Sequence, residues 1–346
     1  MSAIEAALNQ IDDVAAEGDL DSPPPAELLE LEQAGDPIEL PDGKRIYPPT
    51  LYGQPVDELA CCLLDMDNPA ASTFLRLIGP PGAGKSQIAR AIAYRLWAGR
   101  GRTVEERGGA PFYGYVEIAG GPSSDEYLFR HEFVPVADDA GSVRLIDSAF
   151  VQAMRNGWVV MIDEVNTIRD VALLSCNAVF DGRLSLYLAA TGETVLAQPG
   201  FATILAYNPG LVGATDIPDA WHSRFPATLE VTSNWAALAK LGAPPALVRE
   251  ARALDQQRLA GEDGLVWTPQ FRDIEALAQM INRVGERAGL AFFVSNLHEQ
   301  AQAGKIQEAE AAAACRMLDQ AGYAHLKVRA SGRRPNLNGY PRAVTS

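Results

Sequence analysis

The sequence is poor in cysteine and holds no apolar run long enough to cross a membrane. Its four cysteines, Cys61, Cys62, Cys176 and Cys315, fit neither a disulfide framework nor a CxxC metal pair. No basic-then-apolar leader opens the chain. These absences set aside the secreted, membrane-spanning, fibrous and disulfide-stapled classes, and they favour the reducing environment of the cytoplasm.

Basic residues are missing from the first part of the chain. Residues 1–42 hold twelve acidic side chains and no Lys or Arg, so most of the net charge of −15 lies there. Together with the run Pro23-Pro24-Pro25, this composition predicts a disordered leader over residues 1–45, or alternatively an acidic arm that docks a partner. An acidic chain also argues against broad nucleic-acid binding, which needs a basic surface.

Strand and helix signals alternate between residues 46 and 232. The run Trp158–Ile162 is continuously apolar, as is typical of a strand buried on both faces. The other expected elements are strands at 73–78, 113–118, 202–206 and 227–231, a hairpin at 184–188 and 194–198, and helices at 87–97 and 148–155. This alternation predicts an α/β domain with a mostly parallel sheet and helices on both faces.

Strand signals stop after about residue 232. Helical spacing over 246–259 and 306–320 predicts a small all-helical domain over residues 233–326. Within it, Thr268-Pro269 has the residue types of a helix start, because Thr caps free amides and Pro fits the first helical position. Residues 327–346 contain five basic side chains and no acidic one, and we expect a flexible basic tail there.

The strongest motif is Gly79-Pro80-Pro81-Gly82-Ala83-Gly84-Lys85-Ser86, which stands between an apolar strand run and a helical run. Glycines let backbone amides turn around phosphate oxygens, and the following helix points its positive end at the same anion. We expect Lys85 to reach the β- and γ-phosphates, Ser86 to bind Mg²⁺, and Gln87 to complete the nucleotide contacts. The alternative is a glycine-rich turn that contains Lys-Ser by chance.

Polar residues follow two further apolar runs. Asp163 and Glu164 end the run that begins at Trp158, and Asn208 follows the run at 202–206. Ligands of open parallel sheets gather at the carboxyl ends of strands. We expect Asp163 to hold Mg²⁺ through its water shell, Glu164 to act as general base on the attacking water, and Asn208 to bridge that water and the γ-phosphate. The alternatives are a solvated acidic pair and an Asn-Pro turn.

One arginine is a further candidate for the phosphate chemistry. Arg224 lies in the segment Asp219–Phe225, and its rigid guanidinium suits the charge that develops on a transferred phosphoryl group. The alternative is a surface ion pair.

These motifs, in this order, resemble an AAA+ ATPase, and in finer detail its MoxR branch, which includes the CbbQ, NorQ and GvpN proteins. The resemblance covers about residues 50–325. Its parts are Leu51–Gln54 with Tyr52 near the adenine, Gly79–Ser86 as Walker A, Ile162–Asn166 as Walker B, residues 181–209 as a hairpin followed by sensor 1, and Trp221–Phe225 as the arginine-finger segment.

The resemblance implies an ATP- and Mg²⁺-dependent enzyme that works as a homo-oligomeric ring, usually a hexamer, with Arg224 acting on the ATP of the adjacent subunit. It implies chaperone-like remodelling of a protein client, often beside a protein with a von Willebrand A domain. Residues 133–145 are similar to an inserted hairpin that faces the pore. The second sensor of the family falls at Gln270, so this role goes to Arg272, two residues later, or is missing.

Two other functions use the same core. A nucleic-acid motor or restriction-type NTPase would need basic or aromatic pore residues, whereas this segment contains Asp138-Asp139. A non-hydrolysing, nucleotide-gated scaffold would not need Glu164 together with Asn208 and Arg224. The motifs therefore favour an ATPase that acts on a protein, with nucleic acid the less favoured substrate.

Overall fold

The computed structural model describes residues 36–51, 54–64, 74–121, 126–135, 143–208, 217–225 and 227–323. Tyr52, most of the expected leader and the expected basic tail lie outside these residues. The chain forms two compact units: Met1–Leu241 with Gln270–Arg272, and Gly242–Pro269 with Asp273–Ser346. The first unit includes α7 (Trp235–Lys240), so it extends past the boundary expected at residue 232.

A five-stranded parallel sheet forms the centre of the first unit, as the strand–helix alternation predicted. Its strands, in spatial order, are β15 (Ala227–Glu230), β5 (Phe74–Ile78), β14 (Ala202–Tyr207), β11 (Val159–Asp163) and β8 (Tyr115–Ala119). All four neighbouring pairs are parallel. The carboxyl ends of β5, β14 and β11 therefore lie next to one another at one edge of the sheet.

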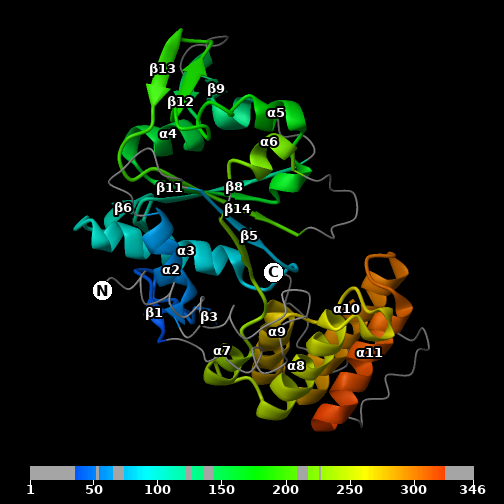
Figure 1. The fold of residues 1–346 in the computed structure, drawn as a ribbon. Coiled ribbons are helices and arrows are strands. Elements are labelled where there is room, and N and C mark those ends of the chain that lie inside the picture. The colour runs from blue at the N-terminus through cyan, green and yellow to red at the C-terminus, as the bar shows by residue number, and fades with distance from the viewer. Residues whose placement is uncertain are drawn as a thin grey trace, which may run out of the picture. The chain divides into compact units, whose positions relative to one another are not determined.

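Helices cover both faces of this sheet. Figure 1 shows α2 (Val56–Leu64) and α3 (Lys85–Gly99) on one face, with α4 (Ala149–Asn156), α5 (Asp170–Leu174) and α6 (Asp219–His222) on the other. This cover explains why β14 is buried at every position and β11 at all but its last. The expected α/β class with helices on both faces is confirmed.

The first unit also contains short antiparallel strand pairs. They are β1 (Ile38–Glu39) with β2 (Arg45–Ile46), β3 (Thr50–Leu51) with β4 (Gln54–Pro55), β6 (Glu105–Arg107) with β7 (Ala110–Phe112), β9 (His131–Pro135) with β10 (Val143–Asp147), and β12 (Ser185–Leu188) with β13 (Glu193–Leu196). The last pair confirms the predicted hairpin. The pair β9–β10 lies where the inserted hairpin was expected, and its tip is outside the described residues.

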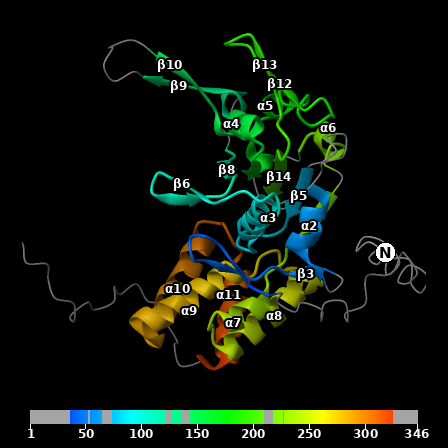
Figure 2. The same cartoon turned by 90° about the vertical axis from the view of Figure 1, so that its left-hand side faces the viewer.

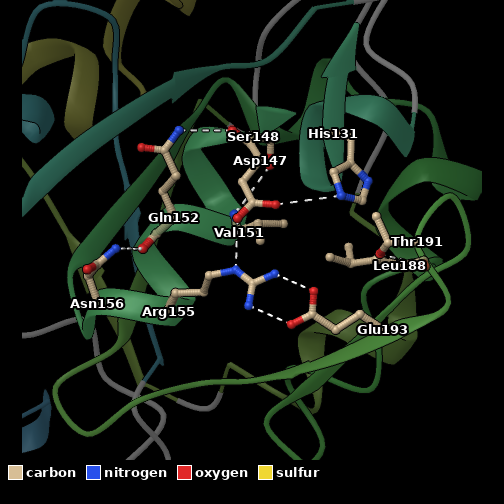
Figure 3. A network of polar contacts seen from close by, with 10 residues as sticks. All are labelled: His131, Asp147, Ser148, Val151, Gln152, Arg155, Asn156, Leu188, Thr191 and Glu193. Atoms are coloured by element: carbon tan, nitrogen blue, oxygen red, sulfur yellow. Dashed lines mark hydrogen bonds and ion pairs between the residues drawn. The ribbon is translucent and has the colours of Figure 1, made fainter. Parts of the chain in front are cut away.

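Charged side chains join the hairpins β9–β10 and β12–β13 to α4 (Figure 3). Arg155 of α4 donates to both carboxylate oxygens of Glu193 on β13, at 2.6 and 2.7 Å, and its Nε donates to Asp147 on β10 at 2.8 Å. The buried His131 of β9 lies 3.6 Å from the same Asp147. Figure 2 shows the two hairpins at the same end of this unit. Arg155 connects them there.

The second unit is helical, as expected. It contains α8 (Pro245–Leu259), most of α9 (Phe271–Val284), α10 (Glu286–Gln302) and α11 (Glu308–Leu318). The predicted helix start at Thr268-Pro269 is wrong, because the helix begins at Phe271. The Thr268 hydroxyl is buried and donates to Asp255 at 3.0 Å. Across the described helices, none is long and apolar enough to cross a membrane.

Candidate functional site

The phosphate loop connects β5 to α3, and its backbone shape depends on glycine. Gly82 and Gly84 have φ values of 84° and 102°, in the left-handed region that side chains disfavour. Gly79 donates its amide to the carbonyl oxygen of Tyr207 at 3.3 Å. A Cβ on Gly79 would lie 2.1 Å from the carbonyl oxygen of Val231. The loop is therefore held between β14 and the end of β15 in a shape that only glycine allows.

Helix α3 begins at Lys85, directly after this loop. Gly84 stands at its N-cap and offers no side chain to the first-turn amides. An anion at this point would accept from those amides and meet the positive end of a helix of 15 residues. Among the other expected contacts, Ala83 is buried, Pro80, Gly82 and Ser86 are half-buried, and Pro81 and Gln87 are exposed.

Lys85 folds back onto the phosphate loop. Its Nζ donates to the carbonyl oxygens of Gly79 at 2.7 Å and Pro80 at 3.0 Å. Burial lowers the pKa of this ammonium, the charges of Asp163 and Glu164 partly oppose that effect, and Arg272 adds to it. The site therefore holds an incompletely compensated cation beside free helix amides, and a phosphate group would supply the missing negative charge.

Asp163 and Glu164 lie at the end of β11. Burial raises the pKa of the Asp163 carboxyl, although its hydrogen bond from the Glu164 amide at 2.9 Å and the charge of Lys85 act in the opposite direction. Glu164 is exposed and has a φ of 50°, which is a strained value for a residue with a side chain. Thr167 stabilises this turn by donating its hydroxyl to the Glu164 carbonyl at 2.7 Å.

Asn208 follows the last residue of β14. The buried side chain of Asn166 donates to the Asn208 carbonyl oxygen at 3.0 Å. This bond ties the segment after β11 to the segment after β14. Asn208 thereby comes close to the acidic pair, as the neighbouring parallel strands require.

The segment Gln270–Arg272 packs on the phosphate loop within the first unit. The amide of Arg272 donates to the carbonyl oxygen of Gly82 at 3.2 Å, and a Cβ on Gly82 would lie 3.5 Å from the Arg272 Nε. Gln270 is buried and accepts from the Ser233 hydroxyl at 2.9 Å. Arg272, unlike Gln270, is exposed beside the loop.

Arg224 lies away from the phosphate loop. Its Nη1 donates to the carbonyl oxygen of Ala220 at 2.6 Å, and its charge helps to lower the pKa of Asp181, after the larger effect of Arg183. Neither residue belongs to the phosphate loop. The structure therefore brings together Lys85 and Asp163 with their neighbours, and it does not place Arg224 among them.

Gly120 is a residue that the sequence motifs missed. Its amide donates to the Asp163 carbonyl oxygen at 2.7 Å, and a Cβ here would lie 2.6 Å from the Glu164 carbonyl oxygen. The sequence signal is the pair Gly120-Gly121, which follows the strand expected at 113–118 after one further residue. A glycine at this point lets the end of β8 approach the acidic pair.

The donor set fits a nucleotide with Mg²⁺. Ser86 supplies a hydroxyl and Asp163 a carboxylate, both oxygen ligands of the type that Mg²⁺ prefers, and phosphate oxygens would supply others. In the described parts of the chain, no group of three or more His, Cys, Asp and Glu side chains is placed to hold a metal ion by itself. A metal shared with a bound phosphate needs no such group.

Residues 75–225 match the protein family described as AAA domain (dynein-related subfamily). This segment is similar to that family, and it includes α3, β11, β14 and all but the first residue of β5, which carry the candidate site. Uncharacterized proteins of Staphylococcus aureus strains USA300 and NCTC 8325 are 28% identical over 149 residues, which is 43% of this chain and 52% of each relative. The chain thus spans about half the length of these curated relatives. A crystal structure of NtrX from Brucella abortus in complex with ADP covers 70% of this chain and 51% of its own, with 16% identity and a TM-score of 0.35.

Proposed function

We propose that the AAA domain binds ATP with Mg²⁺ and hydrolyses the γ-phosphate. The observation that carries the proposal is the arrangement of Lys85, Asp163 and Asn208 at the carboxyl ends of three adjacent parallel strands, beside an uncapped helix N-terminus. A structural role alone would not explain a buried ammonium facing a carboxylate whose pKa is raised by burial.

Each residue has a task in this proposal. Lys85 exchanges its loop carbonyls for phosphate oxygens, which restores its charge balance. Ser86 and Asp163 hold Mg²⁺, which would neutralise charge on the phosphates. Glu164, exposed on a strained turn, takes the proton of the attacking water, and Asn208 orients that water.

Two arginines complete the proposed site. Arg272 takes the role of second sensor, since it lies against Gly82 while Gln270 is bound to Ser233. Arg224 acts on the nucleotide of a neighbouring subunit in a homo-oligomeric ring, usually hexameric in related proteins. Its hydrogen bond to the Ala220 carbonyl and the effect of its charge on Asp181, both away from the phosphate loop of its own subunit, support this arrangement.

The proposed work of the ring is chaperone-like remodelling of a protein, as in the MoxR branch, with a von Willebrand A-domain protein as one candidate partner. The hairpins β9–β10 and β12–β13 are suited to contact a client, since Arg155 joins both to the helix that precedes β11. A nucleic-acid motor is the second candidate, and it is disfavoured by the acidic Asp138-Asp139.

The experiment is a pull-down with tagged Glu164→Gln, with and without ATP, in which bound proteins and nucleic acids are both analysed. This variant should keep ATP bound while water activation is blocked, so that complexes accumulate. Lys85→Ala, which should not bind ATP, is the matched control. A discrete protein captured by Glu164→Gln only with ATP supports remodelling, whereas DNA or RNA without protein supports the motor. Wild-type turnover equal to that of Lys85→Ala would instead support a nucleotide-gated scaffold.

A further inference from the structure

Arg76 is a charged residue in the middle of an otherwise apolar strand. It lies on β5, whose sequence is FLRLI, between β14 and β15. Its side chain is half-buried and reaches an exposed histidine. The Nη1 atom of Arg76 lies 2.6 Å from Nδ1 of His222, the last residue of α6.

A guanidinium has only donors, so Nδ1 of His222 is the acceptor in this contact. The contact is directional, and it joins residues 146 positions apart in the sequence.

Strand β5 holds the segment around Arg224 at a second point. Phe74, two residues before Arg76 and on the same face of the strand, packs on Phe225 with ring centroids 5.3 Å apart. His222 and Phe225 stand on either side of Arg224 in the chain. Phe74 and Arg76 of β5 thus contact the segment that carries Arg224 at two points.

The same strand leads into the phosphate loop. Ile78, two residues after Arg76, is followed directly by Gly79. We propose that Arg76 is a positioning residue, which acts through His222 to hold Arg224 for the nucleotide of the neighbouring subunit. It thereby connects the phosphate loop of one subunit to the arginine that it offers to the next. This inference rests on the proposed ATP hydrolysis with Arg224 acting between subunits.

Mixed assemblies test the proposal. Lys85→Ala subunits, which can offer Arg224 but cannot bind ATP, are co-expressed with Arg224→Ala subunits, which bind ATP but lack the arginine. Two different tags isolate assemblies that contain both, and their turnover should exceed that of either variant alone.

Arg76→Met is then added to one partner at a time. In the Lys85→Ala partner it should lower kcat by about 10- to 100-fold with KM unchanged, the range that misplacement by about 1 Å can produce. In the Arg224→Ala partner it should have little effect.

The conservative variant distinguishes positioning from folding. His222→Asn places an amide oxygen where Nδ1 stood, so in the Lys85→Ala partner it should retain turnover, whereas His222→Phe should lose it. Three results for Arg76→Met would overturn the proposal. Turnover could fall equally in both partners, it could fall only in the Arg224→Ala partner, or it could fall in neither. Mixed assemblies with no turnover, beside an active wild type, would overturn the action of Arg224 between subunits and this inference with it. An inactive wild type would overturn the proposed hydrolysis itself.

Discussion

The amide of Gly120 donates a 2.7 Å hydrogen bond to the carbonyl oxygen of Asp163. This bond brings the end of β8 against the turn that carries Glu164. The approach is so close that a Cβ on Gly120 would meet the Glu164 carbonyl oxygen at 2.6 Å and the Asp163 carbonyl oxygen at 2.9 Å. The geometry of the acidic pair therefore depends on a residue that has no catalytic group.

Gly120→Ala should displace the acidic pair, because the added Cβ would lie 2.6 Å from the Glu164 carbonyl oxygen, too close for both to keep their positions. We expect a fall in ATP turnover of roughly 100-fold, as a displacement of about 1 Å can cause. Gly99→Ala is the matched control, since a Cβ at that last residue of α3 meets nothing within 4 Å. Steady-state turnover of both variants checks this, and equal rates would show that the close approach has no functional role.

The charged carboxylate of Asp163 should lower the stability of the folded protein, although the proposed Mg²⁺ site needs it. Burial raises the pKa of its carboxyl, so the folded protein binds this proton more tightly than the unfolded chain does. Stability therefore falls as pH rises from the ordinary pKa of an aspartate through the raised one. Asp163→Asn removes this loss and keeps an acceptor for the Glu164 amide.

The variant should unfold at higher denaturant concentration than wild type at pH 7, with a gain of about 0.5–2 kcal/mol in the free energy of unfolding. It should also lose Mg²⁺-dependent turnover. The measurement is urea unfolding without nucleotide at several pH values. The gain should shrink as pH approaches about 4, near the ordinary pKa of aspartate. A gain that does not change with pH, or a loss of stability at pH 7, would refute this account of Asp163.

Arg272 should contribute to nucleotide affinity. Arg272→Met removes an exposed cation beside Gly82. We expect ATP to bind at least about tenfold more weakly, because a hydrogen bond to a charged group contributes about 1.5–3 kcal/mol. Arg283→Met, an exposed residue near the end of the same helix, is the control. Titration with a fluorescent ATP analogue compares them, and unchanged affinity in Arg272→Met would leave the second-sensor role without a residue.

Much of the sheet could be predicted from the sequence because its strands are short apolar runs with a clear end. The run expected at 158–162 is β11 at Val159–Asp163, and the run expected at 202–206 is β14 at Ala202–Tyr207. Apolar patterning is a local signal, and it locates strands to within one or two residues. The phosphate loop was equally clear, since its glycines and Lys85 are adjacent in sequence.

Other features depend on contacts that no local pattern reports. No strand was expected between the helix at 87–97 and the strand at 113–118, yet β6 and β7 form there, and Arg107 lies 3.9 Å from the centre of the Phe112 ring. The helix expected to start at Thr268-Pro269 begins at Phe271, and the Thr268 hydroxyl bonds to Asp255, 13 positions away in the sequence. Likewise, the contact of Arg76 with His222 exists only once distant segments have packed together.

The most direct test of the central claim is steady-state ATP turnover with Mg²⁺ for wild type and Glu164→Gln, measured side by side with ATP binding. Loss of the general base should lower turnover by about 10²- to 10⁴-fold while ATP affinity stays within a factor of a few. That result is the one predicted if Glu164 activates the attacking water. Equal turnover in the two proteins would contradict it, and so would wild-type turnover no faster than that of Lys85→Ala.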